Sequence, residues 1–229
     1  MPDATQCRGS RDRLRAVSSC VRALSLGAVL VMALGGCASS GPTPLATSLQ
    51  ALWPSDADAK REAAELPYAS LVVRLENVQG LLVLGAKAGN NTLWPSAEGT
   101  VLSLHDGALH ALAGSNQALL GSTYHDTLPW RQASPAHFRL ARHWRDAEGF
   151  VHRGEAEGMM RCEETPEPIS LPLGERRLER CEVALSWASG ASTEATWWRD
   201  PDSRALWAVR ETPWPDGPSL SWQVARHWW

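Results

Sequence analysis

Hydrophobic and polar positions alternate along most of the chain after residue 67. Leu71, Val73 and Leu75 fall on one side of a first extended segment and Arg74 falls on the other, and this period of two residues is typical of a β-strand. Similar segments cover residues 81–84, 101–105, 108–113, 118–124, 137–145, 150–162, 176–187, 194–199, 204–211 and 219–227, whereas the proline-containing stretch 165–173 is not assigned to a strand. About eight to eleven short strands at hairpin spacing predict a mainly β fold, an antiparallel and strongly curved sheet such as a half-barrel or sandwich.

Two short helices are expected before this sheet. Residues 45–53 carry apolar side chains at helical spacing and are followed by a proline. Ser55 is a suitable N-cap for a second helix, which should end near Leu66 because Pro67 follows it.

The first 36 residues have the layout of a secretory signal peptide. Five arginines precede an apolar run over residues 23–34, which is shorter than the roughly 20 residues that a membrane-spanning helix needs. Leu34-Gly35-Gly36-Cys37 also fits the bacterial lipobox, in which the cysteine thiol receives a diacylglycerol and the chain is cut just before it. The alternative is an ordinary signal peptide with an incidental cysteine. We expect a lipid anchor at Cys37, a tether over residues 37–44 and a single domain over residues 45–229.

The residue after the anchor bears on localisation. An aspartate at this position retains lipoproteins at the inner membrane in enterobacteria-like sorting, but here the residue is Ala38. The periplasmic face of the outer membrane is therefore the expected location.

Charge argues against one class of partner. The formal net charge is −3, and loss of five arginines and two aspartates with the signal peptide makes it −6. A mildly acidic chain without a basic cluster is unsuited to neutralising phosphates, so no nucleic-acid partner is expected.

Cys162 and Cys181 are the two cysteines that remain after the signal peptide and the anchor. An even pair in an oxidising compartment favours a disulfide, which would restrict the unfolded chain by about 3 kcal/mol. A metal site and two buried free thiols are the alternatives.

Tryptophan is the one unusual feature of the composition, with 12 residues against two tyrosines and two phenylalanines. Most are expected to fill the core, and Trp197 and Trp198 must point to opposite faces of a strand. Four that lie in or beside turns could instead form platforms for sugar rings or an acyl chain, namely Trp94, Trp130, Trp198 and Trp214. The terminal pair Trp228-Trp229 is expected to dock against the body, a partner or the membrane interface.

The sequence offers no catalytic or metal-binding motif. His105 and His110 flank the Asp106-Gly107 turn, and His137, His143 and His152 lie on neighbouring strands, but no pair has the spacing of metal ligands. No nucleophile elbow or phosphate-binding glycine loop is present. A protein without enzyme activity, metal or cofactor is expected.

In these features the chain resembles the YjbF/GfcB family of group 4 capsule and exopolysaccharide lipoproteins. The resemblance rests on the order of Cys37, residues 66–75 and 82–85, Trp94, residues 105–107 and 174–178, Cys181 and residues 197–200. It implies an outer-membrane lipoprotein encoded with polysaccharide-secretion genes, whose sheet is a half-barrel similar to lipoprotein-carrier folds. It brings no catalytic residues.

Two functions follow as expectations. The first is a non-catalytic, lipid-anchored protein that assists assembly or export of capsular or extracellular polysaccharide by binding polysaccharide-secretion proteins or glycan. The alternative is a periplasmic carrier that holds an acyl chain or lipoprotein tail in an apolar concavity.

Overall fold

A computed structural model describes residues 56–125 and 127–229, which belong to one compact unit over residues 49–229. The predicted signal peptide, the anchor Cys37, the tether and the predicted helix over residues 45–53 lie outside the described residues. Those predictions remain untested by the structure.

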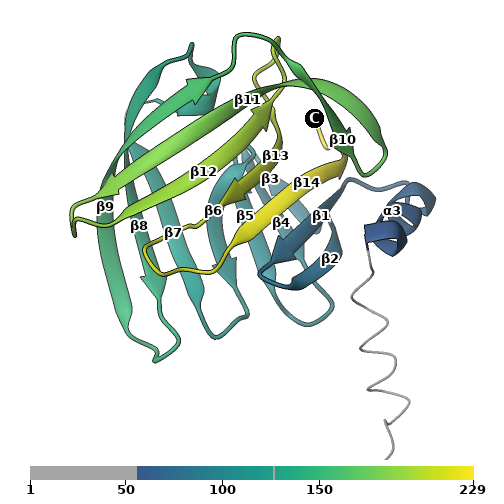
Figure 1. The fold of residues 1–229 in the computed structure, drawn as a ribbon. Coiled ribbons are helices and arrows are strands. Elements are labelled where there is room, and N and C mark those ends of the chain that lie inside the picture. Colours follow the sequence, from purple (N-terminus) through teal and green to yellow (C-terminus); the bar gives the residue numbers. More distant parts are fainter. Residues whose placement is uncertain (1–55, 126) are drawn as a thin grey trace, which may run out of the picture. The chain divides into compact units, whose positions relative to one another are not determined.

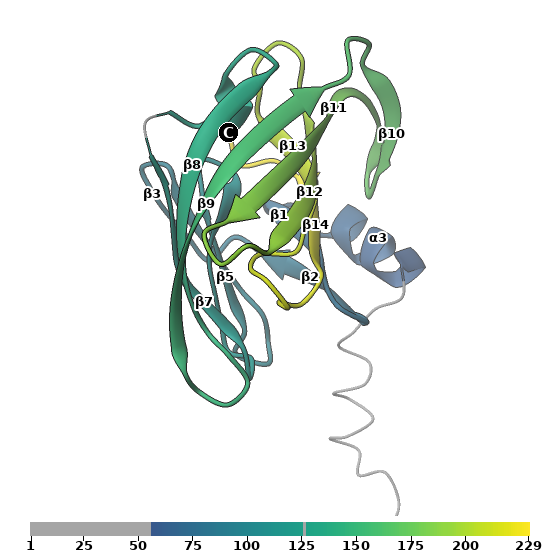
Figure 2. The same ribbon diagram turned by 60° about the vertical axis from the view of Figure 1, so that its left-hand side comes forward.

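The described chain forms one large antiparallel sheet of 14 strands, and its strong curvature is visible in Figures 1 and 2. The strands are β1 (Ser70–Leu75), β2 (Val78–Val83), β3 (Ala86–Ala88), β4 (Asn91–Pro95), β5 (Val101–His105), β6 (Ala108–Ala113), β7 (Ala118–His125), β8 (Ala136–Arg145), β9 (Val151–Cys162), β10 (Glu167–Leu171), β11 (Gly174–Trp187), β12 (Ser192–Arg199), β13 (Leu206–Glu211) and β14 (Leu220–Arg226). The mainly β, antiparallel and curved fold that the sequence predicts is confirmed.

Neighbouring strands in the sheet are consecutive in the sequence except at two places. Its order is β2-β1-β14-β13-β12-β11-β9-β8-β7-β6-β5-β4-β3, so the first strand pairs with the last. β10 pairs only with β11 and folds away as a hairpin, which leaves β9 to pair with β11. Figure 2 shows this hairpin standing out from the curved sheet.

The two ends of the sheet lie close together because β2 and β3 are consecutive in the chain. Between them, the Gly85 backbone N–H donates to the Leu93 carbonyl of β4 at 2.9 Å. A Cβ at Gly85 would lie 2.8 Å from Pro95 Cδ, so a residue with a side chain does not fit without a shift. The sheet is nonetheless not closed by a ladder between its end strands.

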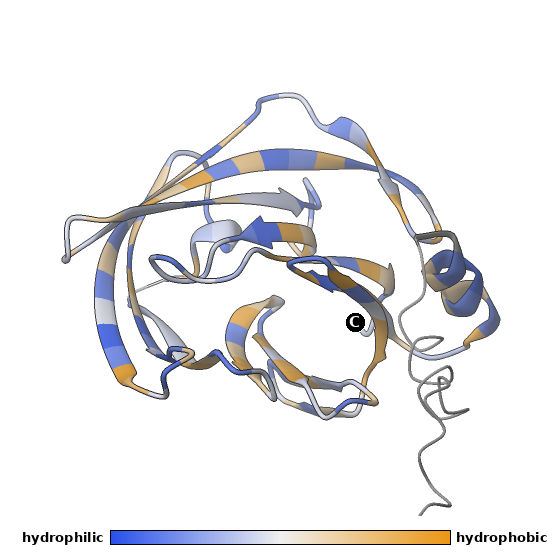
Figure 3. Cartoon of the chain, turned by 60° about the horizontal axis from the view of Figure 1, so that its bottom comes forward, coloured by the Kyte–Doolittle hydropathy of each residue, from blue (hydrophilic) through white to orange (hydrophobic). Residues whose placement is uncertain are grey.

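The concave side of the sheet encloses the core. Hydrophobic and hydrophilic residues alternate along the long strands (Figure 3), and β12 shows the pattern clearly, with Thr193, Ala195, Trp197 and Arg199 buried between exposed or half-buried neighbours. Alternate side chains of each long strand therefore pack in the core, and those between them face outward.

The helix α3 (Asp56–Glu65) confirms the second of the two predicted helices. It buries Ala59 and Ala63, which lie one turn apart on one face. Arg226 Nε of β14 donates to the Leu66 carbonyl at 3.0 Å just beyond the helix, and the helix lies beside β14 and β2 (Figure 1).

Three strands were missed by the alternation pattern. β3 has only three residues, and in β4 a polar residue, Thr92, takes a buried position because it accepts a hydrogen bond from Trp94 Nε1 at 2.9 Å. β10 contains Pro168; it pairs with β11 alone, and proline is tolerated at a sheet edge. These additions raise the strand number above the expected range.

The structure contains the disulfide between Cys162 and Cys181. The two residues face each other directly in the β9–β11 ladder. The bond therefore fixes the register of these two strands at the point where the β10 hairpin leaves the sheet.

Candidate functional site

Three of the four tryptophans predicted as ligand platforms lie in the core. Trp94 and Trp130 have no exposed surface and Trp214 is 2% exposed. Their rings contact other aromatic side chains: Trp94 meets Trp228 at 4.8 Å between ring centroids and Trp130 meets Trp197 at 5.6 Å. With 2% or less of their surface exposed, these three rings present no free face to solvent in this structure.

Trp198 differs from the other three. It alternates with the buried Trp197 on β12 and is half-buried on the outward face of the sheet, as the period of two residues predicts. Trp198 therefore remains as a platform candidate.

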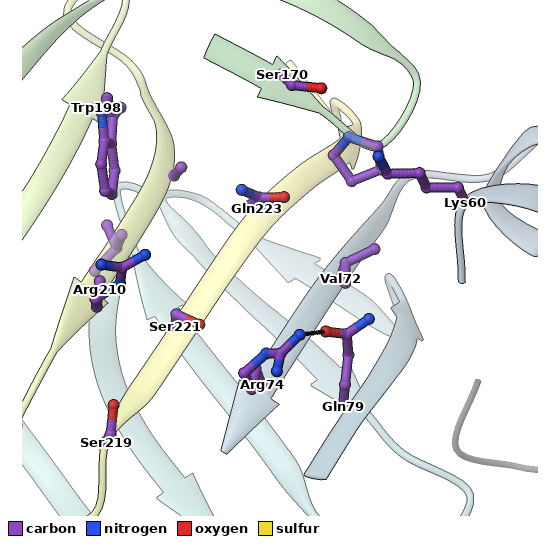
Figure 4. Close-up of a pocket in the computed structure, with 13 residues that line it drawn as sticks. Lys60, Val72, Arg74, Gln79, Ser170, Trp198, Arg210, Ser219, Ser221 and Gln223 are labelled. Atoms are coloured by element: carbon purple, nitrogen blue, oxygen red, sulfur yellow. Dashed lines mark hydrogen bonds between the residues drawn. The ribbon is translucent and has the colours of Figure 1, made fainter. Parts of the chain in front are cut away.

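A groove of about 560 Å³ lies on this outward face, and Trp198 forms part of its wall. Figure 4 shows the groove crossing β1, β14 and β13, with β10 at one side and α3 at the other. Its lining residues are Lys60, Val72, Arg74, Gln79, Ser170, Pro172, Trp198, Ala208, Val209, Arg210, Ser219, Ser221 and Gln223. The curved sheet supplies the floor, and the hairpin and helix supply the sides.

The register of the sheet explains why these residues meet. Arg210 of β13 and Arg74 of β1 both pair with Ser221 of β14, from opposite sides. Two residues further along the strands, Gln223 likewise pairs with Ala208 and Val72. Small side chains at the centre, Ser221 and Ala208, leave the hollow between the longer ones.

Hydrogen bonds and ring contacts orient the groove's larger side chains. Arg74 donates to Gln79 of the neighbouring strand (Figure 4). The Arg210 guanidinium lies 5.9 Å from the centroid of the Trp198 ring, and Trp198 Nε1 donates to Glu167 Oε1 of β10 at 3.4 Å. The indole is thereby held between the hairpin and the sheet.

The groove is locally positive on an acidic chain. Lys60, Arg74 and Arg210 line it, and none of the described residues that line it is acidic, although the full sequence carries a net charge of −3. Sequence reasoning singled out Trp198 but missed these cations, because the sheet brings them together from residues far apart in the chain. The available signal was the polar position of Arg74 in an otherwise apolar strand.

The lining suits binding better than catalysis. Ser170, Ser219 and Ser221 carry hydroxyls, but within residues 56–125 and 127–229 no histidine, cysteine or carboxylate lines the groove with them. A serine nucleophile needs an adjacent base, which these lining residues do not supply.

A cluster of possible metal ligands lies elsewhere, where Cys162, Glu179 and Cys181 lie within 4.8 Å of one another. The two sulfur atoms are bonded to each other, and Glu179 Oε2 accepts a hydrogen bond from Arg199 Nε at 2.7 Å. These groups are therefore already engaged in the disulfide and an ion pair.

Three of the five histidines noted in the sequence have protein partners. His105 Nδ1 lies 2.8 Å from Asn91 Oδ1, and His110 Nδ1 lies 3.0 Å from the Ser122 carbonyl. His152 pairs with Asp146 at 2.6 Å and lowers the pKa of that carboxyl group. His137 is exposed and His143 is half-buried, both on β8.

A second cavity, of about 250 Å³, lies on the concave side near the β1–β2 turn. Its wall is mainly aliphatic and includes Val73, Leu75, Val78, Leu82, Leu102, Leu112 and Leu220. An apolar concavity of this kind is what the carrier alternative requires.

The terminal tryptophans contact the body of the protein. Trp228 packs against Trp94, and Trp229 lies 5.3 Å from Trp207 between ring centroids. Trp229 keeps 47% of its surface exposed. Within residues 56–125 and 127–229, no helix has the length and apolar character needed to cross a bilayer.

Comparisons with known proteins support the fold and give a family. The crystal structure of the hypothetical lipoprotein YmcC from Escherichia coli K12 is similar, with a TM-score of 0.65 and 16% identity over 82% of this chain and 98% of that one. A protein from Bacteroides fragilis NCTC 9343, described as exported with a YmcC-like fold, has a TM-score of 0.35 and 9% identity over 69% of this chain and 94% of its own. No curated protein matches the chain.

The similarity to YmcC shows that the two proteins share a fold, which in this chain is the curved antiparallel sheet described above. A family model for the group 4 capsule polysaccharide lipoproteins, named for GfcB and YjbF, matches residues 47–224. That match covers most of the sequence and nearly the whole sheet. The chain therefore belongs to the YjbF family of group 4 capsule polysaccharide lipoproteins.

Proposed function

We propose that this protein is anchored by a lipid at Cys37 to the periplasmic face of the outer membrane and assists assembly or export of capsular or extracellular polysaccharide. The carrying observation is the family match over residues 47–224. The lipobox around Cys37 and the alanine that follows it support the anchor and its location.

On this proposal the protein acts by binding and not by catalysis. The described lining of its outward groove supplies cations, hydroxyls, amides and the Trp198 indole, and it places no nucleophile beside a base. The partners are the membrane, polysaccharide-secretion proteins and the glycan itself.

Gene deletion tests this function. Loss of the gene should reduce the surface polysaccharide, measured by quantifying extracted glycan per cell, and a plasmid copy of the wild-type gene should restore it. Surface polysaccharide that is unchanged in the deletion strain would refute the proposal. Restoration by the plasmid excludes an effect on neighbouring genes.

The apolar cavity favours a second candidate, a carrier of an acyl chain. Its volume of about 250 Å³ is below the roughly 300–1,000 Å³ of typical ligand pockets, so it suits the end of a chain better than a whole lipid.

A fluorescent fatty acid tests this carrier function. Saturable binding should be lost in Val73→Phe, which fills the cavity, and kept in Leu93→Phe, which changes an exposed residue of β4 outside the cavity lining. Absence of saturable binding to the wild-type protein would remove this candidate.

A further inference from the structure

Two arginines lie on opposite sides of one serine in the outward groove. Arg74 and Arg210 both pair with Ser221, on the strands to either side of it. Neighbouring strands are about 4.8 Å apart, which places the two arginine Cα atoms about 10 Å from each other. Both guanidinium groups can therefore reach an anionic group that lies over Ser221.

Trp198 lies in the next row of the same face. It pairs with Ala208, two residues from Arg210 along β13, which places its Cα about 8 Å from that of Arg210 by strand geometry. Its Nε1, at the ring edge, donates to Glu167, and the Arg210 guanidinium lies 5.9 Å from the ring centroid, so a sugar ring stacked on the indole would lie beside Arg210. An indole face offers a flat apolar surface on which a sugar ring can stack.

The charges sort the groove into two parts. Three cations, Lys60, Arg74 and Arg210, are among the described lining residues, whereas Glu167 accepts a hydrogen bond from the edge of the Trp198 ring. An anionic group is thus favoured between Arg74 and Arg210, and a neutral ring is favoured at Trp198.

The remaining lining completes a binding surface for a hydroxyl-rich chain. Ser219, Ser221 and Gln223 follow β14 across the floor, and Ser170 of β10 faces them (Figure 4). Their hydroxyl and amide groups can both donate and accept. The groove lies on the surface of the sheet, so a polymer can pass along it without being threaded.

We propose that this groove binds an acidic segment of a polysaccharide, with a sugar carboxylate between Arg74 and Arg210 and an adjacent sugar ring on Trp198. Arginine binds carboxylates through paired hydrogen bonds. This inference rests on the proposed function, because it names the part of the protein that touches the glycan and the chemical class of that glycan.

Calorimetric titration of the full chain in detergent tests the proposal. Hexagalacturonate should bind, and its affinity should fall as salt is raised because the contact depends on charge. Cellohexaose, which has the same number of rings but no carboxylates, should bind at least tenfold more weakly.

Substitutions in the groove locate the site. Arg74→Gln and Arg210→Gln should each weaken hexagalacturonate binding about tenfold, as expected for loss of a charge-assisted hydrogen bond. Arg153→Gln makes the same change at an exposed position of β9 outside the groove and should leave the affinity unaltered. Thermal midpoints equal to wild type show that each variant is folded.

Trp198→Ala should weaken binding of hexagalacturonate severalfold, since stacking of a sugar ring on the indole is lost. Phe150→Ala removes an aromatic residue that is 68% exposed in the turn before β9 and serves as the control. Equal effects of these two substitutions would contradict a role for Trp198.

Three results would overturn the groove proposal: hexagalacturonate fails to bind, both arginine variants bind it as wild type does, or a thymidine dodecamer displaces it with equal affinity. The last result would reduce the groove to a general anion site. If one of these occurs while gene deletion still lowers surface polysaccharide, the groove assignment fails and the proposed function stands.

Discussion

Arg142 of β8 and Glu211 of β13 form an ion pair in the core, where their side chains are only 1% and 4% exposed. Arg142 Nη2 lies 2.8 Å from Glu211 Oε2, and Arg142 also donates to Ser122 Oγ and to the Pro213 carbonyl. Burial disfavours the charge of Arg142, but Glu211 and Tyr124 together more than offset this, so the pKa of Arg142 is raised. The pair joins two strands that are not neighbours in the sheet.

Breaking this pair from one side should cost much more than removing it entirely. Glu211→Gln should lower the free energy of unfolding by about 3–5 kcal/mol, because the Arg142 charge stays buried without its counterion. The double variant Arg142→Met with Glu211→Leu should recover most of that loss. Urea unfolding measures the free energies of both variants. The control Glu182→Gln, which breaks an exposed ion pair, should lower the free energy of unfolding by less than about 1 kcal/mol. Equal losses in the single and double variants would contradict this account.

Ionisation of the buried Tyr124 should lower the free energy of unfolding at alkaline pH. Burial raises the pKa of its phenol, partly opposed by Arg142. A pKa that is higher in the folded than in the unfolded state favours folding below the unfolded value, and this contribution is lost as pH rises above it. In Tyr68→Phe, where Tyr124 is the sole tyrosine, phenolate absorbance should therefore appear at higher pH in native than in urea-unfolded protein. Coincident titration curves would contradict the prediction.

Single residues show how far the sequence alone could go. The opposite placement of Trp197 and Trp198 followed from the strand period and is confirmed. The burial of Trp94, Trp130 and Trp214 did not follow, because residues beside turns can be covered by segments remote in sequence. Trp130, for example, packs against Trp197 of β12, which is far away in the sequence.

The pairing of β8 with β9 depends on a glycine. Gly158 lies opposite Phe138, and a Cβ at Gly158 would lie 2.2 Å from Phe138 Cζ. The phenyl ring thus occupies the space over the glycine, as in sheets where an aromatic residue covers a cross-strand glycine.

Gly158→Ala should therefore destabilise the protein by about 1–3 kcal/mol, the usual cost of overpacking a core. Gly121→Ala is the matched control, since Gly121 also lies within a strand but has no atom within 4 Å of the added Cβ. Thermal unfolding should show a lower midpoint for Gly158→Ala only. Similar midpoints for the two variants would show that Phe138 can move aside at little cost.

Element prediction succeeded where one face of a strand is consistently apolar. β5 and β6 were predicted with their observed bounds because the Asp106-Gly107 turn separates two alternating segments. The alternation pattern did not predict β4 or β10. In β4 a hydrogen-bonded threonine takes a core position, and β10 contains a proline that is tolerated because the strand lies at a sheet edge. The groove could not be predicted, because β1, β13 and β14 become neighbours only through the pairing of the first strand with the last.

At the scale of the whole molecule, the sheet uses its two faces differently. The concave face holds the core and its buried ion pair, while the outward face carries the cationic groove with Trp198. The proposed function needs this outward face to be held near the membrane through which the polysaccharide passes. On this proposal, that placement comes from the lipid at Cys37.

Membrane fractionation of two variants separates anchoring from sorting. Cys37→Ala should leave the protein soluble or as an uncleaved precursor, because the thiol that receives the lipid is absent. Ala38→Asp should keep the protein in the membrane fraction but move it from the outer to the inner membrane, as the enterobacterial sorting pattern predicts.

Surface polysaccharide should fall in both variants, since a folded sheet in the wrong place cannot reach its partners. Wild-type fractionation of Cys37→Ala would refute the anchor, and wild-type polysaccharide with Ala38→Asp mislocalised would refute the need for the outer membrane.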